Sequence, residues 1–266
     1  MIEANTVHNE TEAMHKTGQH IEMVASPRWV RVLFGGEYIA NSQRVLLMRE
    51  KGHTPVYYFP EEDVRTEFLQ PTDHTTHCPY KGDAVYWTIT VGDQVAENAV
   101  WSYPEPLEEA PDLTGYLAFD WEEMDAWFEE NEEIFLHPRD PFKRVDTLPS
   151  SRHVEVEVNG VTVGESSRPV ILFETGLPPR YYLPKTDVRQ DLLIPGEKVT
   201  VCPYKGKAHY YSVKTDEEIN ENIAWYYRYP KSGLGEIENH ICFYDERVDA
   251  VYVDGERQPK PETPFA

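Results

Sequence analysis

The sequence contains two copies of one pattern. When the chain is shifted along itself by 124 residues, the separation between Cys78 and Cys202, the two halves align without a gap. The stretch Cys-Pro-Tyr-Lys-Gly that begins at Cys78 then falls on the same five residues beginning at Cys202. Further matches run along both halves, at Arg44/Arg168, Pro55/Pro179, Tyr57/Tyr181, Asp63/Asp187, Arg65/Arg189, Glu97/Glu221, Trp101/Trp225 and Tyr103/Tyr227. One fixed offset over so many positions indicates an internal duplication.

The duplication predicts two domains rather than a repeat array. A solenoid needs at least three units to bury its faces, whereas each half of this 266-residue chain is long enough for its own core. We therefore expect the halves to pack about a pseudo-twofold axis, as a covalent equivalent of a homodimer, with a homodimer of the whole chain as an open alternative.

Composition predicts where the two domains begin and end. Residues 1–27 are polar with little periodicity and are predicted to be a flexible leader, followed by the first domain at 28–136. Residues 137–151 are polar and rich in proline, which is typical of a linker. The second domain is predicted at 152–257, and 258–266 is a C-terminal tail.

Most local patterns are those of β-strands. Residues 154–158 alternate apolar and charged, Asn159-Gly160 follows, and 161–163 alternate again, which predicts a hairpin with a type I′ turn. One helical turn is expected at 61–64, after a proline. Residues 251–255 of the second copy suggest a hairpin added to that copy.

One segment of the first copy has the pattern of a helix. Asp120 could cap it, and Trp121, Met124 and Trp127 recur at helical spacing, which predicts a helix over 120–132. The expected fold is therefore mainly β, with two antiparallel domains in tandem and one short helix in the first copy.

Charge and cysteine usage exclude several classes of function. The chain has 47 acidic and 25 basic residues, and its net charge of −22 repels phosphate backbones and anionic lipid, so neither nucleic acid nor a membrane is expected as a partner. The cysteines are Cys78, Cys202 and Cys242, without a C-x-x-C pair. This sparse set argues against disulfides and structural zinc, and it favours a cytoplasmic protein without a metal or other cofactor.

Three motifs together resemble a known family. The Cys-Pro-Tyr-Lys-Gly stretch lies between an upstream Tyr-Tyr-x-Pro-x-x-Asp-Val-Arg element and a downstream Glu-Asn-x-x-Trp-x-Tyr element. In both copies, from about residue 28 to 256, this pattern is similar to the bacterial and fungal family called domain of unknown function 427. The resemblance implies small antiparallel β domains of the β-tent architecture found in Mss4-like proteins, methionine sulfoxide reductase B and the cereblon ligand-binding domain. It also implies a pocket between two converging sheets.

The chain departs from that pattern in two ways. The two C-x-x-C zinc knuckles of many β-tent proteins are missing, and the aromatic cage of the cereblon-type domain cannot be placed residue by residue. The family also carries a nucleotidyltransferase label, but this sequence has no glycine-rich loop followed by paired carboxylates to support it.

The candidate catalytic residues are repeated in the two copies. Cys78 could be a nucleophile whose pKa is lowered by Lys81, or simply a small buried residue. Glu97 could be a general base if it is desolvated, or part of a salt bridge at a strand edge. The equivalents in the second copy are Cys202, Lys205 and Glu221. A Cys-His dyad common to both copies is excluded, because His74 and His77 align with Lys198 and Val201.

The candidate ligand-binding residues are basic, aromatic or amide side chains. Repeated arginines in an acidic chain could line an anion-binding pocket together with Lys81, or they could form salt bridges with residues such as Asp63. Repeated aromatic residues could form a pocket wall or pack in a core. The candidates are Arg44, Arg65, Tyr80, Asn98 and Trp101, with their copies Arg168, Arg189, Tyr204, Asn222 and Trp225.

These residues favour a protein with a small-molecule pocket in each domain, for a ligand that could be anionic. The first hypothesis is an enzyme of unassigned reaction. The alternatives are a non-catalytic ligand-binding or sensor module, the nucleotidyltransferase activity that the family label suggests, and a purely structural role.

Overall fold

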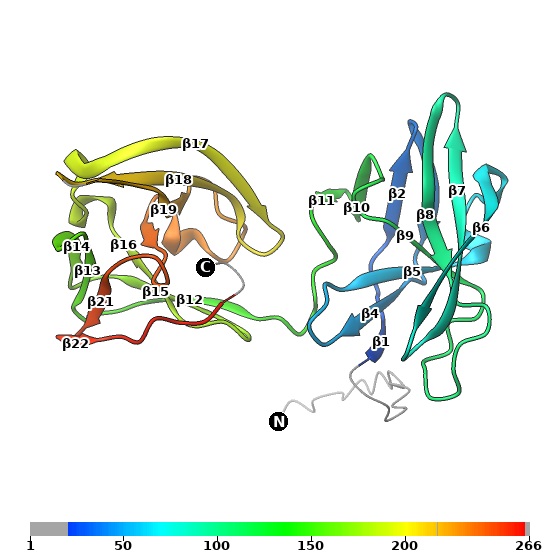
Figure 1. Ribbon diagram of the computed structural model, residues 1–266, viewed down its shortest axis with the longest axis horizontal. Coiled ribbons are helices and arrows are strands. Elements are labelled where there is room, and N and C mark those ends of the chain that lie inside the picture. Colours follow the sequence, from blue (N-terminus) through cyan, green and yellow to red (C-terminus); the bar gives the residue numbers. More distant parts are fainter. Residues whose placement is uncertain (1–20, 217, 264–266) are drawn as a thin grey trace, which may run out of the picture. The chain divides into compact units, whose positions relative to one another are not determined.

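The computed structural model describes residues 21–216 and 218–263 of the chain (Figure 1). It divides into two compact units, Met1–Asp140 and Pro141–Ala266, and each contains one copy of the repeat. The described residues form β-strands and short 3₁₀ turns, with no α-helix among them. None of the described segments is a helix long and apolar enough to cross a membrane.

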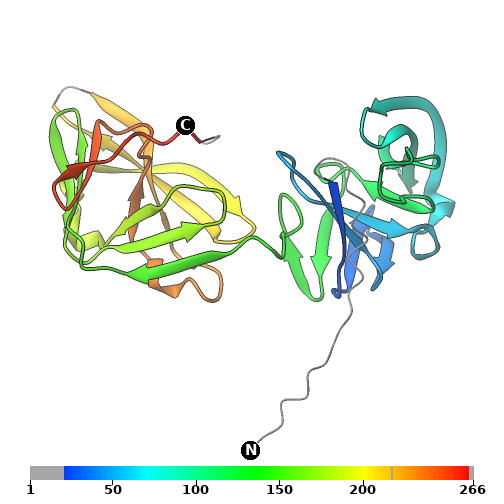
Figure 2. The ribbon, with the colours of Figure 1, turned by 90° about the horizontal axis from the view of Figure 1, so that it is seen from below.

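The first unit consists of two antiparallel sheets. The strand order of the seven-stranded sheet is β1 (Ile21–Ala25), β4 (Leu46–Glu50), β5 (Val56–Pro60), β9 (Tyr116–Phe119), β8 (Gln94–Ser102), β7 (Gly82–Val91) and β6 (Leu69–Cys78). The order of the four-stranded sheet is β11 (Glu132–Ile134), β10 (Ala126–Glu129), β2 (Val30–Phe34) and β3 (Glu37–Ser42). Two 3₁₀ turns, η1 (Glu61–Asp63) and η2 (Thr66–Phe68), join β5 to β6. Figure 2 shows the long strands β6, β7 and β8, in cyan to green, bending strongly.

The second unit repeats this topology strand for strand. Its seven-stranded sheet has the order β12 (Val145–Pro149), β15 (Val170–Glu174), β16 (Arg180–Leu183), β20 (Ile241–Phe243), β19 (Ile219–Tyr227), β18 (Gly206–Lys214) and β17 (Leu193–Cys202). Its four-stranded sheet has the order β14 (Val161–Ser166), β13 (Val154–Val158), β21 (Ala250–Val253) and β22 (Glu256–Arg257). The 3₁₀ turns are η3 (Lys185–Asp187), η4 (Gln190–Leu192) and η5 (Gly235–Ile237). The predicted duplication is therefore confirmed at the level of topology.

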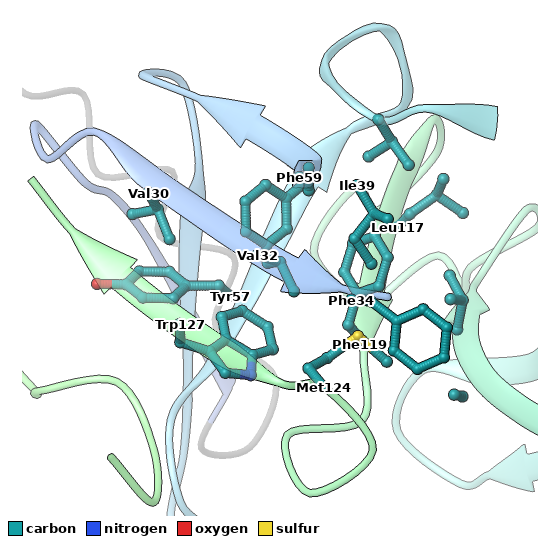
Figure 3. Close-up of a cluster of buried hydrophobic side chains, with 14 of the residues drawn as sticks. Val30, Val32, Phe34, Ile39, Tyr57, Phe59, Leu117, Phe119, Met124 and Trp127 are labelled. Carbon is teal, nitrogen blue, oxygen red and sulfur yellow. The ribbon is translucent and has the colours of Figure 1, made fainter. Parts of the chain in front are cut away.

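The main core of each unit lies between its two sheets. In the first unit, Val30 and Val32 of β2 and Trp127 of β10 meet Phe59 of β5 and Phe119 of β9 (Figure 3). Phe59 and Phe119 pack edge to face, with ring centroids 5.6 Å apart. Alternate residues of each strand point into this core because side chains alternate along a β-strand. The opposite face of the seven-stranded sheet is therefore left to a second set of side chains.

The turn predictions from the sequence are confirmed. Asn159 and Gly160 join β13 to β14 and have φ values of 50° and 70°, as a type I′ turn requires. Gly35 and Gly36 occupy the same place in the first unit, with φ values of 59° and 79°. The helical turn after Pro60 is η1.

The helix predicted over 120–132 is wrong. Residues 126–129 form β10, which pairs with β2 and β11, and Asp120 accepts a hydrogen bond from the backbone N–H of Glu122 in a turn. The aromatic stripe has a different origin, since the Trp121 and Trp127 rings stack at 4.3 Å across the turn. The β10–β11 hairpin matches β21–β22, so the hairpin predicted for the second copy is present but is not an addition to it.

Two segments predicted to lack regular structure contain strands. β1 lies within the predicted leader and pairs with β4, and β12 lies within the predicted linker and pairs with β15. Both are edge strands, and the equivalent position of the two strands shows that the repeat extends further toward the N-terminus than the sequence indicated. Residues 1–20 of the predicted leader and 264–266 of the predicted tail lie outside the described residues.

Candidate functional site

The second face of each seven-stranded sheet gathers aromatic and polar side chains. Tyr58 of β5 points away from the sandwich core because its neighbours Tyr57 and Phe59 point into it. There Tyr58 meets side chains from three more strands. We call this cluster the aromatic face; it comprises Tyr58, Cys78, Tyr86, Trp101 and Tyr103 in the first unit and Tyr182, Cys202, Tyr210, Trp225 and Tyr227 in the second.

The same hydrogen bonds link the aromatic face in both units. The Trp101 Nε1–H donates to the Tyr58 hydroxyl at 3.3 Å, and the Trp225 Nε1–H donates to Tyr182 at 3.0 Å. The hydroxyls of Thr76 and Tyr86 lie 2.8 Å apart, and their equivalents Thr200 and Tyr210 also lie 2.8 Å apart. These contacts fix the orientation of one tryptophan and two tyrosines in each unit.

The buried phenols of the aromatic face remain protonated. Burial is the largest effect raising the pKa of Tyr58 and of Tyr103 above the ordinary tyrosine value. The same holds for Tyr182 and Tyr227. Tyr103 is 6% exposed, and its hydroxyl has no hydrogen-bond partner within the described part of the chain. A protonated, unpaired phenol of this kind can donate to a ligand oxygen or nitrogen.

Lys81 lies beside the aromatic face and is already paired. Its Nζ lies 2.6 Å from Glu50 Oε2, and their side chains are 9% and 14% exposed. Lys81 also lies 5.9 Å from the centre of the Tyr103 ring. In the second unit Lys205 forms the same ion pair with Glu174, and Lys143 adds a second cation at 3.0 Å.

The predicted nucleophiles lie on the aromatic face. Cys78 and Cys202 end β6 and β17 as free, partly buried thiols. The ammonium of Lys81 is hydrogen-bonded to Glu50, and no base is hydrogen-bonded to Cys78 within the described ranges. Cys78 and Lys81 therefore lie in the same part of the unit, but the lysine is hydrogen-bonded to Glu50 and not to the thiol.

The predicted arginines form surface ion pairs. Arg44 bonds to Asp63 at 2.7 Å, and Arg168 bonds to Asp187 at 2.9 Å. The hydrogen bond from Arg168 is the largest of the effects that lower the pKa of Asp187 to about 2. The second repeated pair of arginines, Arg65 and Arg189, also forms ion pairs with nearby carboxylates. Arg65 pairs with Glu37 and Glu67, and Arg189 pairs with Asp191. Their contacts lie around the 3₁₀ turns rather than on the aromatic face.

The backbone conformation explains why asparagine recurs in the repeated Glu-Asn pair. Glu97 and Glu221 are exposed, whereas Asn98 and Asn222 have φ values of 53° and 51° at irregular places in β8 and β19. Asparagine tolerates this left-handed conformation far better than a β-branched residue. The geometry of the strand therefore accounts for the repeat of asparagine.

Substitutions of Asn222 test this explanation. We expect Asn222→Val to lower the unfolding free energy of the second unit by about 1–2 kcal/mol, because valine is strained at positive φ. Asn222→Gly should stay close to wild type, since glycine adopts this φ without strain. Urea denaturation of the three proteins is the measurement, and equal stability of the valine and glycine variants would contradict the explanation.

The remaining candidate ligand-binding residues lie either on the aromatic face or toward the protein surface. Trp101 and Trp225 belong to the aromatic face. Tyr80 is 48% exposed, and the ring of Tyr204 faces Lys143 at 5.3 Å. The sequence interpretation missed Glu50 and Tyr58, although both repeat at the 124-residue offset as Glu174 and Tyr182 and could have been found by it.

One group of possible metal ligands lies elsewhere in the second unit. His153 Nδ1 lies 3.3 Å from Glu155, and His153 Nε2 lies 3.0 Å from Glu165. The two carboxylates approach different nitrogens of one imidazole, and none of the three residues is buried. These are the contacts of a surface ion-pair network.

A family model matches both copies. The model describes a domain of unknown function (DUF427), and it covers residues 22–130 and 146–254. The chain belongs to this family. Both matches begin one residue into the first strand of a unit, which places β1 and β12 inside the family's domain. No curated protein matches the chain.

Proposed function

We propose that this DUF427 protein binds a small ligand with a planar ring at the aromatic face, and that it does so without chemical conversion. The observation that carries the proposal is the repeated set of one tryptophan and three tyrosines on one face of each unit. Rings provide large apolar contact area, and phenol and indole groups supply directed hydrogen bonds, a combination typical of small-molecule sites.

The charges near the site favour a neutral ligand over an anion. Each cation that the sequence offered for an anion pocket is engaged by a carboxylate: Lys81 by Glu50, Arg44 by Asp63 and Arg65 by Glu67. An incoming anion would have to displace one of these pairs in a chain of net charge −22. A neutral ring can bind without displacing an ion pair and without repulsion from the negative charge of the chain.

Binding explains the geometry better than catalysis does. Covalent catalysis by Cys78 would need a base within hydrogen-bond reach, and general base catalysis by Glu97 would need burial of that carboxylate. Glu97 is exposed on β8. We further propose that the domains are β-tents and that the protein acts in the cytoplasm, as the family resemblance and the cysteine usage favour.

A thermal-shift screen of small neutral heteroaromatic and phenolic compounds tests the proposal. A true ligand should raise the Tm of the protein saturably, because it binds the folded state alone. The shift should be lost when Trp101 and Trp225 are both replaced by alanine. It should persist in Trp29→Ala, a control residue that directly precedes β2 of the four-stranded sheet. Product formation from a stabilising compound, or a shift that survives loss of both tryptophans, would contradict the proposal.

A further inference from the structure

The two units differ at positions around the aromatic face that matter for access, and the first of these is residue 120. Residue 120 of the first unit aligns with residue 244 of the second, and the backbone is held in the same way in both. The N–H of Asp120 donates to the Ala99 carbonyl at 2.7 Å, and the N–H of Tyr244 donates to the Ile223 carbonyl at 2.9 Å. The side chains are an exposed carboxylate in one unit and a phenol ring in the other.

Tyr244 covers the aromatic face of the second unit. Its ring centre lies 4.5 Å from that of Trp225, and its hydroxyl lies 3.5 Å from the hydroxyl of Tyr210. The Arg247 guanidinium lies 5.6 Å from the Tyr244 ring, and Arg180 lies 5.8 Å from Trp225. As a result, Trp225 is only 7% exposed and Tyr210 only 5%.

The equivalent positions of the first unit hold neither an aromatic ring nor an arginine. Asp120 bonds to the backbone of Glu122, and the positions of Arg180 and Arg247 are taken by Val56 and Glu123. Trp101 and Tyr86 are both partly exposed. Among residues 21–216 and 218–263, no ring packs on Trp101 as Tyr244 packs on Trp225, and the His74 ring lies 4.6 Å from the Tyr86 ring.

We infer that the first unit alone holds an open ligand site, and that Tyr244 is a built-in occupant of the second. This inference rests on the proposed function. The side chain of Tyr244 then shows what Trp101 and Tyr86 can accept: a neutral phenol ring packed against the indole at an angle of 47°, with its hydroxyl directed at the hydroxyl of a tyrosine. The ligand class is therefore a hydroxylated aromatic ring, bound once per chain.

The covalent attachment of Tyr244 explains why it would exclude a free ligand. A tethered group competes at an effective concentration of about millimolar or above. A free phenol has few atoms and is expected to bind with a Kd on the order of 1 mM. The second unit should therefore become accessible only when the Tyr244 ring is removed.

The test is a titration of the ¹⁵N-labelled full-length protein with p-cresol, which is the tyrosine side chain as a free molecule. Indole N–H signals of Trp101 and Trp225 are assigned from their alanine variants and followed by NMR, with the Trp29 signal as an internal control. In the wild type we expect a saturable shift of Trp101 and none of Trp225. In Tyr244→Ala both signals should shift, whereas Tyr229→Ala, which removes a 79% exposed tyrosine of the same unit, should behave as wild type.

The reciprocal variant is Asp120→Tyr, which gives the first unit the residue of the second. It should abolish the shift of Trp101 while the dispersion of the other signals shows an intact fold. Three results would overturn the inference and leave the proposed function standing: a response of Trp225 in the wild type, a response of Trp101 but not of Trp225 in Tyr244→Ala, or a persistent Trp101 response in Asp120→Tyr. If neither indole responds in the wild type or in Tyr244→Ala, both proposals fail.

Discussion

Replacement of Lys81 by methionine is expected to lower the unfolding free energy of the first unit by about 3–5 kcal/mol, because it leaves the charge of Glu50 buried without a partner. Glu50 is 14% exposed, and Lys81 is its only ion-pair partner in the described residues. Lys205→Met in the second unit should cost less, since Lys143 remains 3.0 Å from Glu174. The two lysines thus provide a matched comparison within one chain.

The measurement is urea denaturation of the full chain. Circular dichroism follows both units, and tryptophan fluorescence reports mainly on the first, which contains five of the six tryptophans. The double variant Lys81→Met/Glu50→Leu should recover much of the lost stability, because it removes the unpaired charge together with its partner. Equal losses in Lys81→Met and Lys205→Met, or no recovery in the double variant, would show that burial of an unpaired Glu50 is not the cause.

Arg180→Met should destabilise the second unit by a similar amount, about 3–5 kcal/mol near pH 8. The Arg180 guanidinium donates two hydrogen bonds to Glu246, at 2.9 and 2.5 Å, and lies 3.6 Å from Asp245. The two carboxylates are 3% and 10% exposed. Without arginine, two acidic groups would share a buried site with no cation between them.

The cost of Arg180→Met should depend on pH. Burial is the main effect that raises the pKa of Asp245 from 3.8 to about 7, even with arginine present. A carboxyl whose pKa is higher in the folded state stabilises the fold below pH 4, and this contribution is lost as pH rises from about 4 to about 7. Arg180 lowers the pKa of Glu246 through its hydrogen bond, so loss of Arg180 should remove that effect and should raise the pKa of Asp245 further. Protonation should then relieve the repulsion between the two carboxyls at low pH.

Urea denaturation of wild type and Arg180→Met at pH 5 and pH 8, followed by circular dichroism, checks this expectation. The difference in unfolding free energy between the two proteins should be smaller at pH 5. Asp245→Asn serves as the control background, in which the wild-type decline between pH 4 and pH 7 should flatten. A cost of Arg180→Met that is the same at both pH values would contradict the assignment.

The duplication made much of the fold predictable. Alternating patterns and glycine or asparagine turns marked the strands, and a second copy confirmed which patterns recur. The helix failed because Trp121, Met124 and Trp127 have helical spacing while their contacts are those of a turn and a hairpin. Spacing alone cannot tell a stripe on a helix from two rings that stack across a turn.

The candidate site was only partly predictable, because a repeat preserves structural and functional residues alike. Asn98 is repeated because of its backbone conformation, and Arg44 is repeated because of its ion pair with Asp63. Trp101 and Cys78, in contrast, are repeated on the aromatic face. Glu50 repeats as clearly as Lys81, but the ion pair between them joins β4 to the turn before β7 and became visible only in three dimensions. The sequence shows that Asp120 aligns with Tyr244. Only the structure shows that the Tyr244 ring packs against Trp225, and this contact is what connects the difference to ligand access.

A crystal of the wild-type protein soaked with p-cresol tests the central claim most directly. We predict density for one ring against Trp101 in the first unit, with its hydroxyl near Tyr86, and the Tyr244 side chain still against Trp225 in the second. Density for the ring only at other places on the surface, or equally in both units, would contradict the account.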